Sequence, residues 1–119
     1  RANLKYLNIH VDDRLKICPI TSQEYFRQLN QEPHFDFILV DGDHDRIACA
    51  NDLESAHIVC EAGGVIVCDD LSSNPGECNL IGVWEEWKSK HKDEYVSIEI
   101  LEGKGCGVAI RVDRDVLHE

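Results

Sequence analysis

The sequence predicts a single small α/β domain whose sheet is mostly parallel and ends in an antiparallel hairpin. Two apolar segments, "FDFILV" and "VIVC", each lead directly into acidic residues, and a helical pattern separates them. A third observation is the alternation of apolar residues after position 95, followed by a glycine-containing turn and a further apolar segment. Strand, helix and strand in this order predict a parallel crossover, whereas a short turn joins antiparallel strands. The 119 residues leave room for one modest core, so we treat residues 1–119 as one domain.

The first third of the chain predicts a short strand and a capped helix. Residues 4–9 have the spacing of the last turns of an amphipathic helix, and Leu15 to Cys18 is apolar enough for a strand. Thr21 or Ser22 can cap the helix that follows, which runs through Gln23 to Leu29.

The central segment predicts two neighbouring parallel strands. Phe35 to Val40 is almost continuously apolar, which is typical of a strand buried on both faces. A helix is expected from about Asp45 to Glu61, and Gly63-Gly64 should end it before the strand Val65 to Cys68. Because a right-handed crossover makes these strands parallel, the acids that follow them should meet at one carboxyl edge of the sheet.

The last third predicts a helix and a hairpin. Trp84 and Trp87 have helical spacing, and we expect them in the core or an interface rather than around a substrate. The charged run Lys88 to Glu94 is interpreted as a solvated helix end. Tyr95 to Leu101 and Val108 to Val112 are expected to pair as antiparallel strands.

Composition limits the partners. Lys plus Arg total 12 and Asp plus Glu total 23, so the formal net charge is -11 and the pI is near 4.8. Nucleic acid and anionic membrane surfaces would be repelled, whereas a metal ion would be attracted. The absence of a long apolar segment and of a signal peptide favours a cytoplasmic location.

The cysteines and most histidines suggest no site. The cysteines mostly lie among aliphatic residues, as reduced buried thiols do, and none are two residues apart as in zinc or redox motifs; they are Cys18, Cys49, Cys60, Cys68, Cys78 and Cys106. Five histidines share no spacing, and we assign them no role: His10, His34, His57, His91 and His118.

"FDFILVDGDH", "GGVIVCDD", "GVWEEW" and the hairpin, in this order, resemble the C-terminal half to two-thirds of a class I S-adenosylmethionine-dependent methyltransferase, a Rossmann-like fold. The similarity is greatest to metal-dependent small-molecule O-methyltransferases of the catechol type and of sugar and antibiotic tailoring. The family's glycine-rich loop and the acid after its second strand are absent, so the sheet should lack its first two strands. The chain also contains no methionine and begins at Arg1, from which we expect a fragment that is inactive alone.

The resemblance implies S-adenosylmethionine and Mg²⁺ as cofactors and a small-molecule hydroxyl as the methyl acceptor. Each acid alone could simply cap a turn, but three at matched strand ends, with the resemblance, favour a metal site at Asp41, Asp69 and Asp70. Similar enzymes place a general base at Asp43, and His44 is the alternative because its pKa suits proton removal, although it could equally start a helix. Cofactor contacts are expected at Ser22, Gln23, Asp41 and Gly42.

Three other functions share features with this sequence. "FILVDGDHD" also resembles the motif of haloacid-dehalogenase-like phosphotransferases, but those enzymes expect Thr or Val at Asp45 and a later Lys that cannot be placed. A phosphoacceptor receiver domain would carry its acidic pair earlier in the chain. The third reading is a non-catalytic methyltransferase-like domain that forms a homo-oligomer through open sheet edges.

Overall fold

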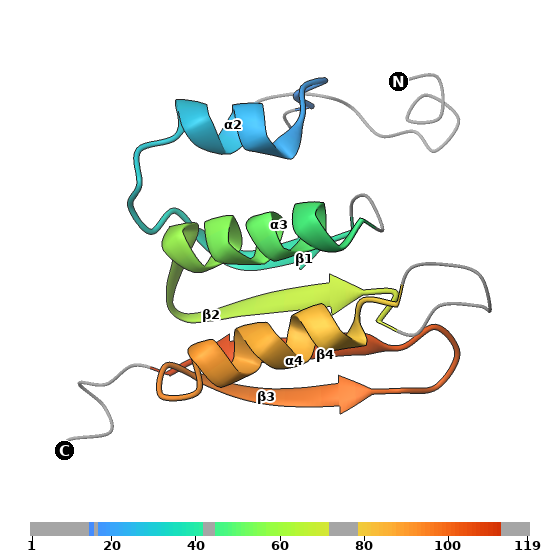
Figure 1. Cartoon of the computed structure of the whole chain (residues 1–119). Coiled ribbons are helices and arrows are strands. Elements are labelled where there is room, and N and C mark those ends of the chain that lie inside the picture. Colours follow the sequence, from blue (N-terminus) through green and yellow to red (C-terminus); the bar gives the residue numbers. More distant parts are fainter. Residues whose placement is uncertain (1–14, 16, 42–44, 72–78, 113–119) are drawn as a thin grey trace, which may run out of the picture.

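The structure is a computed structural model that describes residues 15, 17–41, 45–71 and 79–112 (Figure 1). A four-stranded sheet carries three helices in these residues. The strands are β1 (Phe35–Val40), β2 (Cys60–Asp69), β3 (Tyr95–Ile100) and β4 (Cys106–Arg111). The helices are α2 (Ser22–Gln28), α3 (Arg46–Val59) and α4 (Ile81–Lys90).

The sheet has the predicted mixture of parallel and antiparallel pairing. Its order is β1-β2-β4-β3; β1 and β2 are parallel, while β4 is antiparallel to both of its neighbours. The last strand therefore lies between β2 and β3, and the hairpin completes the sheet on one side. No strand of the described residues pairs with the outer edge of β1.

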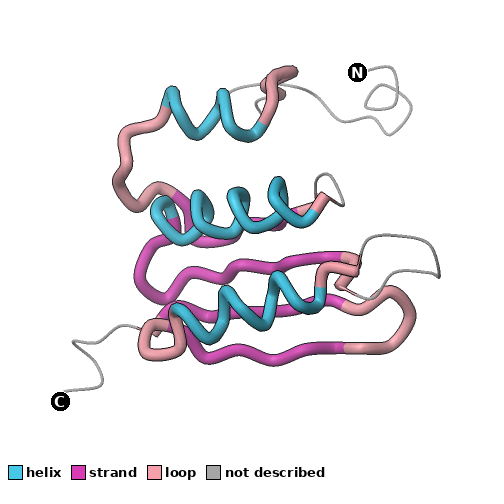
Figure 2. The backbone as a smooth tube through the Cα atoms, in the orientation of Figure 1, coloured by secondary structure: helices cyan, strands magenta, loops and turns pink. Residues whose placement is uncertain are grey.

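Local sequence explains where the helices begin. The Thr21 side chain accepts a hydrogen bond from the Glu24 amide and caps α2, as expected. Asp45 does the same for α3 through the Ala48 amide. At α4 the oxygen of the Asn79 side chain accepts from the Ile81 amide. Figure 2 shows α3 and α4 on the same face of the sheet, with α2 further out.

The core lies between that face and the two helices. The two tryptophans are buried in it, which confirms the prediction for Trp84 and Trp87. The Trp84 indole Nε1 donates to the Glu99 carboxylate at 2.9 Å, so its polar atom is satisfied. The predicted helix face is likewise buried at Cys49, Leu53 and Ala56.

The strand predicted at Leu15 to Cys18 is not found. Leu15 and residues 17–20 belong to no strand. A strand exists through its pairing, and in the expected sheet this segment is separated from β1 by the two strands that the sequence lacks. Without a neighbouring strand, this apolar segment has no partner for its backbone hydrogen bonds and does not form a strand.

The expected helix stop at Gly63-Gly64 is also wrong. Helix α3 already ends at Val59 because Cys60 is extended, with φ -84° and ψ 127°. The glycines lie inside β2, where the register with β1 shifts between Phe35 and Phe37. Gly63 has φ 79°, and a Cβ at Gly64 would lie 2.8 Å from the Cys60 sulfur, so both positions suit glycine.

The run Lys88 to Glu94 is not simply a solvated helix end. His91 is only 8% exposed, because the end of α4 packs against α3. Lys88 forms ion pairs with Glu85 and Glu99. The charges here are therefore engaged in tertiary contacts.

The second face of the sheet is apolar and uncovered by the described residues. Phe37 and Val96, for example, are 60% and 61% exposed. The strand registers place six exposed apolar side chains on this face: Phe37, Leu39, Val96, Ile98, Ile100 and Ile110. The prediction that β1 is buried on both faces is thus wrong for the described residues. Within the described residues, no helix has the length and apolar character needed to cross a membrane.

Candidate functional site

Three carboxylates meet at one edge of the sheet, as the strand pattern predicts. Val40 pairs with Cys68 in parallel register, so Asp41 and Asp69 follow at the same level. One carboxylate oxygen each from Asp41, Asp69 and Asp70 lies within 4.8 Å of the other two. We call these three residues the acidic edge. Ligands of open α/β sheets bind at this end of the strands.

Asp70 has an unusual backbone conformation. Its φ is 57°, in the left-handed region that non-glycine residues rarely adopt. The backbone is held on both sides: Asp69 pairs with Cys106 in the sheet, and the amide of the buried Leu71 donates to the Gly105 carbonyl at 3.2 Å. Such conformations persist only where the surroundings impose them, and they are frequent at functional sites.

A cavity of about 580 Å³ lies beside the acidic edge. Asp41, directly after β1, and Ser22, the first residue of α2, both line it. Apolar and aromatic side chains supply much of the remaining wall, including Tyr25, Phe26 and Val40. The volume falls within the range of small-molecule sites, about 300–1,000 Å³.

Asp52 is a lining residue that the sequence analysis missed. Its Oδ1 atom accepts a hydrogen bond from the Ser22 hydroxyl at 2.7 Å, which ties α2 to α3. Asp52 has the helical spacing of the residues facing β1, but nothing in the sequence distinguishes it from an ordinary surface acid. It orients one of the expected cofactor contacts.

Gln23, a further predicted cofactor contact, does not line this cavity. Gln23 lines a separate hollow with Arg27 and Asn51. Gly42, Asp43 and His44 lie outside the described residues, so their predicted roles remain predictions.

The thiols near the acidic edge belong to the core. The Sγ atoms of Cys49 and Cys68 are 3.9 Å apart, and both residues are buried. The hydrogen bond with Cys49 and burial raise the pKa of the Cys68 thiol, and the nearby charges of Asp69 and Asp41 add to this effect. Cys68 therefore stays protonated at neutral pH. The five cysteines of the described part are free, as expected.

A second polar cluster, which the sequence did not predict, lies near the start of β2, at the end of the sheet opposite to the acidic edge. It contains His57, His91 and Glu94, whose candidate ligand atoms lie within 4.8 Å of one another. The two histidines are 34 positions apart, the difference between 91 and 57, so no local spacing could have indicated that they meet.

The fold and the acidic edge define a methyltransferase-type α/β domain, and comparison with known families agrees. The chain belongs to the family described as "Methyltransferase domain", whose model matches residues 1–71. No curated protein sequence matches the chain.

A solved structure supports the same fold. The chain is similar to the crystal structure of a Staphylococcus aureus protein designated a caffeoyl-CoA O-methyltransferase, with a TM-score of 0.65 and 12% sequence identity. The similarity covers 92% of this chain and 56% of that structure, so the chain spans little more than half of its solved neighbour. At this identity the match establishes the fold.

Proposed function

We propose that this chain is part of an S-adenosylmethionine-dependent O-methyltransferase that uses Mg²⁺ and acts on a hydroxyl of a small molecule. The observation that carries the proposal is the meeting of Asp41, Asp69 and Asp70 beside a cavity in a methyltransferase fold. The designation of the solved neighbour as an O-methyltransferase favours oxygen as the acceptor atom.

The acidic edge fits a hard divalent cation. Mg²⁺ prefers oxygen ligands, and the three residues offer three carboxylate oxygens from the ends of two paired strands. When bound, the ion would lower the pKa of an acceptor hydroxyl and fix its direction. The three carboxylates would hold the ion in place. Asp43 or His44 remains the proposed general base that removes the proton from the hydroxyl.

The cavity fits part of a nucleoside-containing cofactor. Tyr25 and Phe26 offer aromatic surface for a flat ring, and the Ser22 hydroxyl and Asp41 carboxylate offer polar contacts. The cavity also borders the metal residues through Asp41, so one molecule could reach both. Methyl transfer depends largely on alignment of the methyl donor with the acceptor. A cofactor in the cavity, beside an acceptor hydroxyl on the metal ion, would favour that alignment.

Titration of S-adenosylmethionine into the ¹⁵N-labelled chain, followed by amide chemical shifts, tests the proposal and detects weak binding. The expected shifts lie around Ser22, Asp41 and Asp52, and they should weaken in Ser22→Ala. Asp36→Asn, an exposed change on β1 away from the cavity, should bind like the parent chain. An absence of shifts at millimolar cofactor, or shifts confined to other residues, would contradict the proposal.

A further inference from the structure

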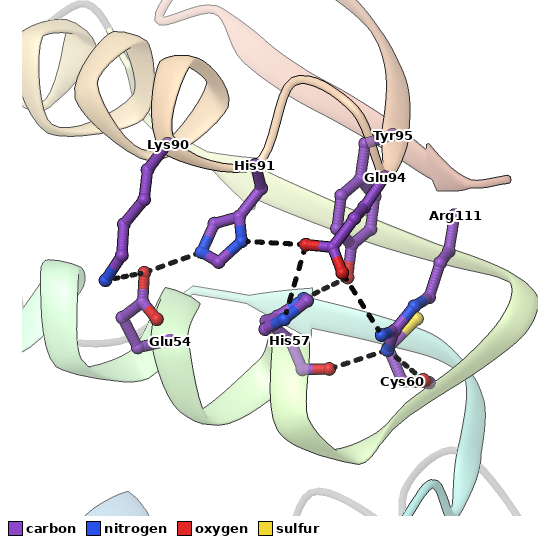
Figure 3. Close-up of polar contacts among 8 residues, drawn as sticks. All are labelled: Glu54, His57, Cys60, Lys90, His91, Glu94, Tyr95 and Arg111. Carbon is purple, nitrogen blue, oxygen red and sulfur yellow. Dashed lines mark hydrogen bonds and ion pairs between the residues drawn. The ribbon is translucent and has the colours of Figure 1, made fainter.

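The cluster at the far edge of the sheet has a defined position in the fold (Figure 3). His57 comes from the last turn of α3, His91 caps the end of α4, and Glu94 precedes β3. All three lie near the start of β2, whereas the acidic edge lies at its end. We call His57, His91 and Glu94 the histidine cluster.

The distances within the histidine cluster suit a small cation. Glu94 Oε2 lies 3.2 Å from His91 Nδ1 and 3.7 Å from His57 Nε2. Two ligands at about 2.0–2.1 Å from a tetrahedral zinc ion are separated by about 3.3 Å. Both distances to the carboxylate oxygen are thus near the spacing that this ion requires, and the candidate ligand atoms of the two histidines lie within 4.8 Å of each other.

Each histidine is oriented by a partner on its other nitrogen. The Nε2 atom of His91 lies 2.8 Å from the Glu54 carboxylate, which is also paired with Lys90. The Nδ1 atom of His57 lies 2.8 Å from the Tyr95 hydroxyl. A carboxylate or hydroxyl behind each imidazole is the usual support of a metal-binding histidine, since it fixes the ring and its tautomer.

The surroundings allow an ion to be reached and held. His91 is buried and His57 is 17% exposed, while the Glu94 side chain is 35% exposed and leaves a solvent path. Arg111 lies near the other Glu94 oxygen, Oε1, at 4.0 Å, and donates to the carbonyls of His57 and Cys60.

We propose that His57, His91 and Glu94 form a Zn²⁺ site, separate from the acidic edge, with a water molecule as the fourth ligand. Two imidazoles and a carboxylate are a donor set that zinc favours over magnesium. The ion joins the ends of α3 and α4 to the start of β3. Its role in this chain is to stabilise the fold.

Calorimetric titration of Zn²⁺ into the chelator-treated, fully reduced 119-residue chain tests the site. With excess Mg²⁺ present to occupy the acidic edge, one equivalent of zinc should bind, and the midpoint of thermal unfolding should rise by about 5 °C when zinc exceeds its Kd tenfold. His57→Gln, His91→Gln and Glu94→Gln should each weaken binding about tenfold or more, and Glu54→Gln should weaken it less. His34→Gln, an exposed histidine elsewhere, and Asp69→Asn should bind like the parent chain.

Co²⁺ substitution separates this site from the thiols, because thiolate ligands add an intense charge-transfer band and imidazole ligands do not. The expected spectrum shows tetrahedral cobalt without that band. The proposal is overturned by an absence of saturable zinc binding, by thiolate absorption, or by loss of binding in Asp69→Asn with retention in Glu94→Gln. Since His91 is buried, the partly exposed Glu94 and His57 variants decide the result if His91→Gln fails to fold.

Discussion

Glu99 shows how one residue connects the core with the surface charge. Its carboxylate accepts from the buried Trp84 indole and pairs with Lys88. The hydrogen bond from Lys88 lowers the pKa of Glu99 below its ordinary 4.5, despite the opposing effect of burial, and the bond from Trp84 adds to the lowering. The ionised form is therefore favoured in the folded state.

This shift predicts a pH dependence for Glu99→Gln. A lowered carboxyl pKa stabilises the fold above the unfolded pKa, about 4.5, and the contribution is lost as the pH falls through the folded value. The difference in thermal midpoint between parent and variant should be largest at pH 7 and should shrink below pH of about 4.5. Unfolding scans from pH 7 to 3 measure it, with Glu102→Gln in an exposed turn as the control. A difference that stays constant with pH would contradict the account.

Single residues also limit what the sequence can reveal. Asp41, Asp69 and Asp70 were predictable as a group because each lies at the end of a strand that the local pattern identifies. The ends of neighbouring parallel strands lie at the same edge of a sheet. His57 and His91 were not, because their meeting depends on how the ends of α3 and α4 pack. Tertiary packing of helix ends leaves no periodic signal in a sequence.

Helix α4 packs closely on the sheet at Gly107. A Cβ atom there would approach the buried Trp84 ring to less than 3.0 Å, whereas a Cβ at Gly82 in α4 would meet nothing within 4 Å. The close approach explains why β4 carries a glycine opposite the helix.

Gly107→Ala should therefore destabilise the chain by about 1–3 kcal/mol, the typical cost of overpacking a core. Gly82→Ala is the matched control and should be neutral or stabilise by up to about 1 kcal/mol, because alanine favours helix. Urea denaturation of both variants provides the comparison. Equal stability of Gly107→Ala and the parent chain would show that α4 does not pack as described.

At the level of elements, the sequence pattern correctly predicted the parallel pair and the hairpin. It wrongly predicted a strand at Leu15 to Cys18 and a helix stop at Gly63-Gly64. Pattern identifies an apolar segment, whereas pairing makes it a strand. Gly63 and Gly64 fit the pattern of a helix end, yet they lie inside β2, because the strand already begins at Cys60, which pairs with Phe35.

The whole molecule has an uncovered apolar sheet face and an unpaired β1 edge within the described residues. We propose that a second copy of the chain covers them, because exposed strands with apolar side chains favour association. Light scattering should then show dimers or larger species at micromolar concentration. Ile98→Glu, on the apolar face, should reduce association; Ile47→Glu, an exposed change on α3, should not. A monomer at all concentrations would contradict this.

The central claim is that Asp41, Asp69 and Asp70 form a divalent cation site. Titration of the ¹⁵N-labelled chain with Mn²⁺, a paramagnetic substitute for Mg²⁺, tests it most directly, because the ion broadens nearby amide signals. The account predicts broadening around Asp41, Asp69 and Asp70 that excess Mg²⁺ reverses and that Asp69→Asn abolishes. The control variant Asp36→Asn should show the same broadening as the parent chain. Uniform broadening, or broadening only around His57 and His91, would contradict it.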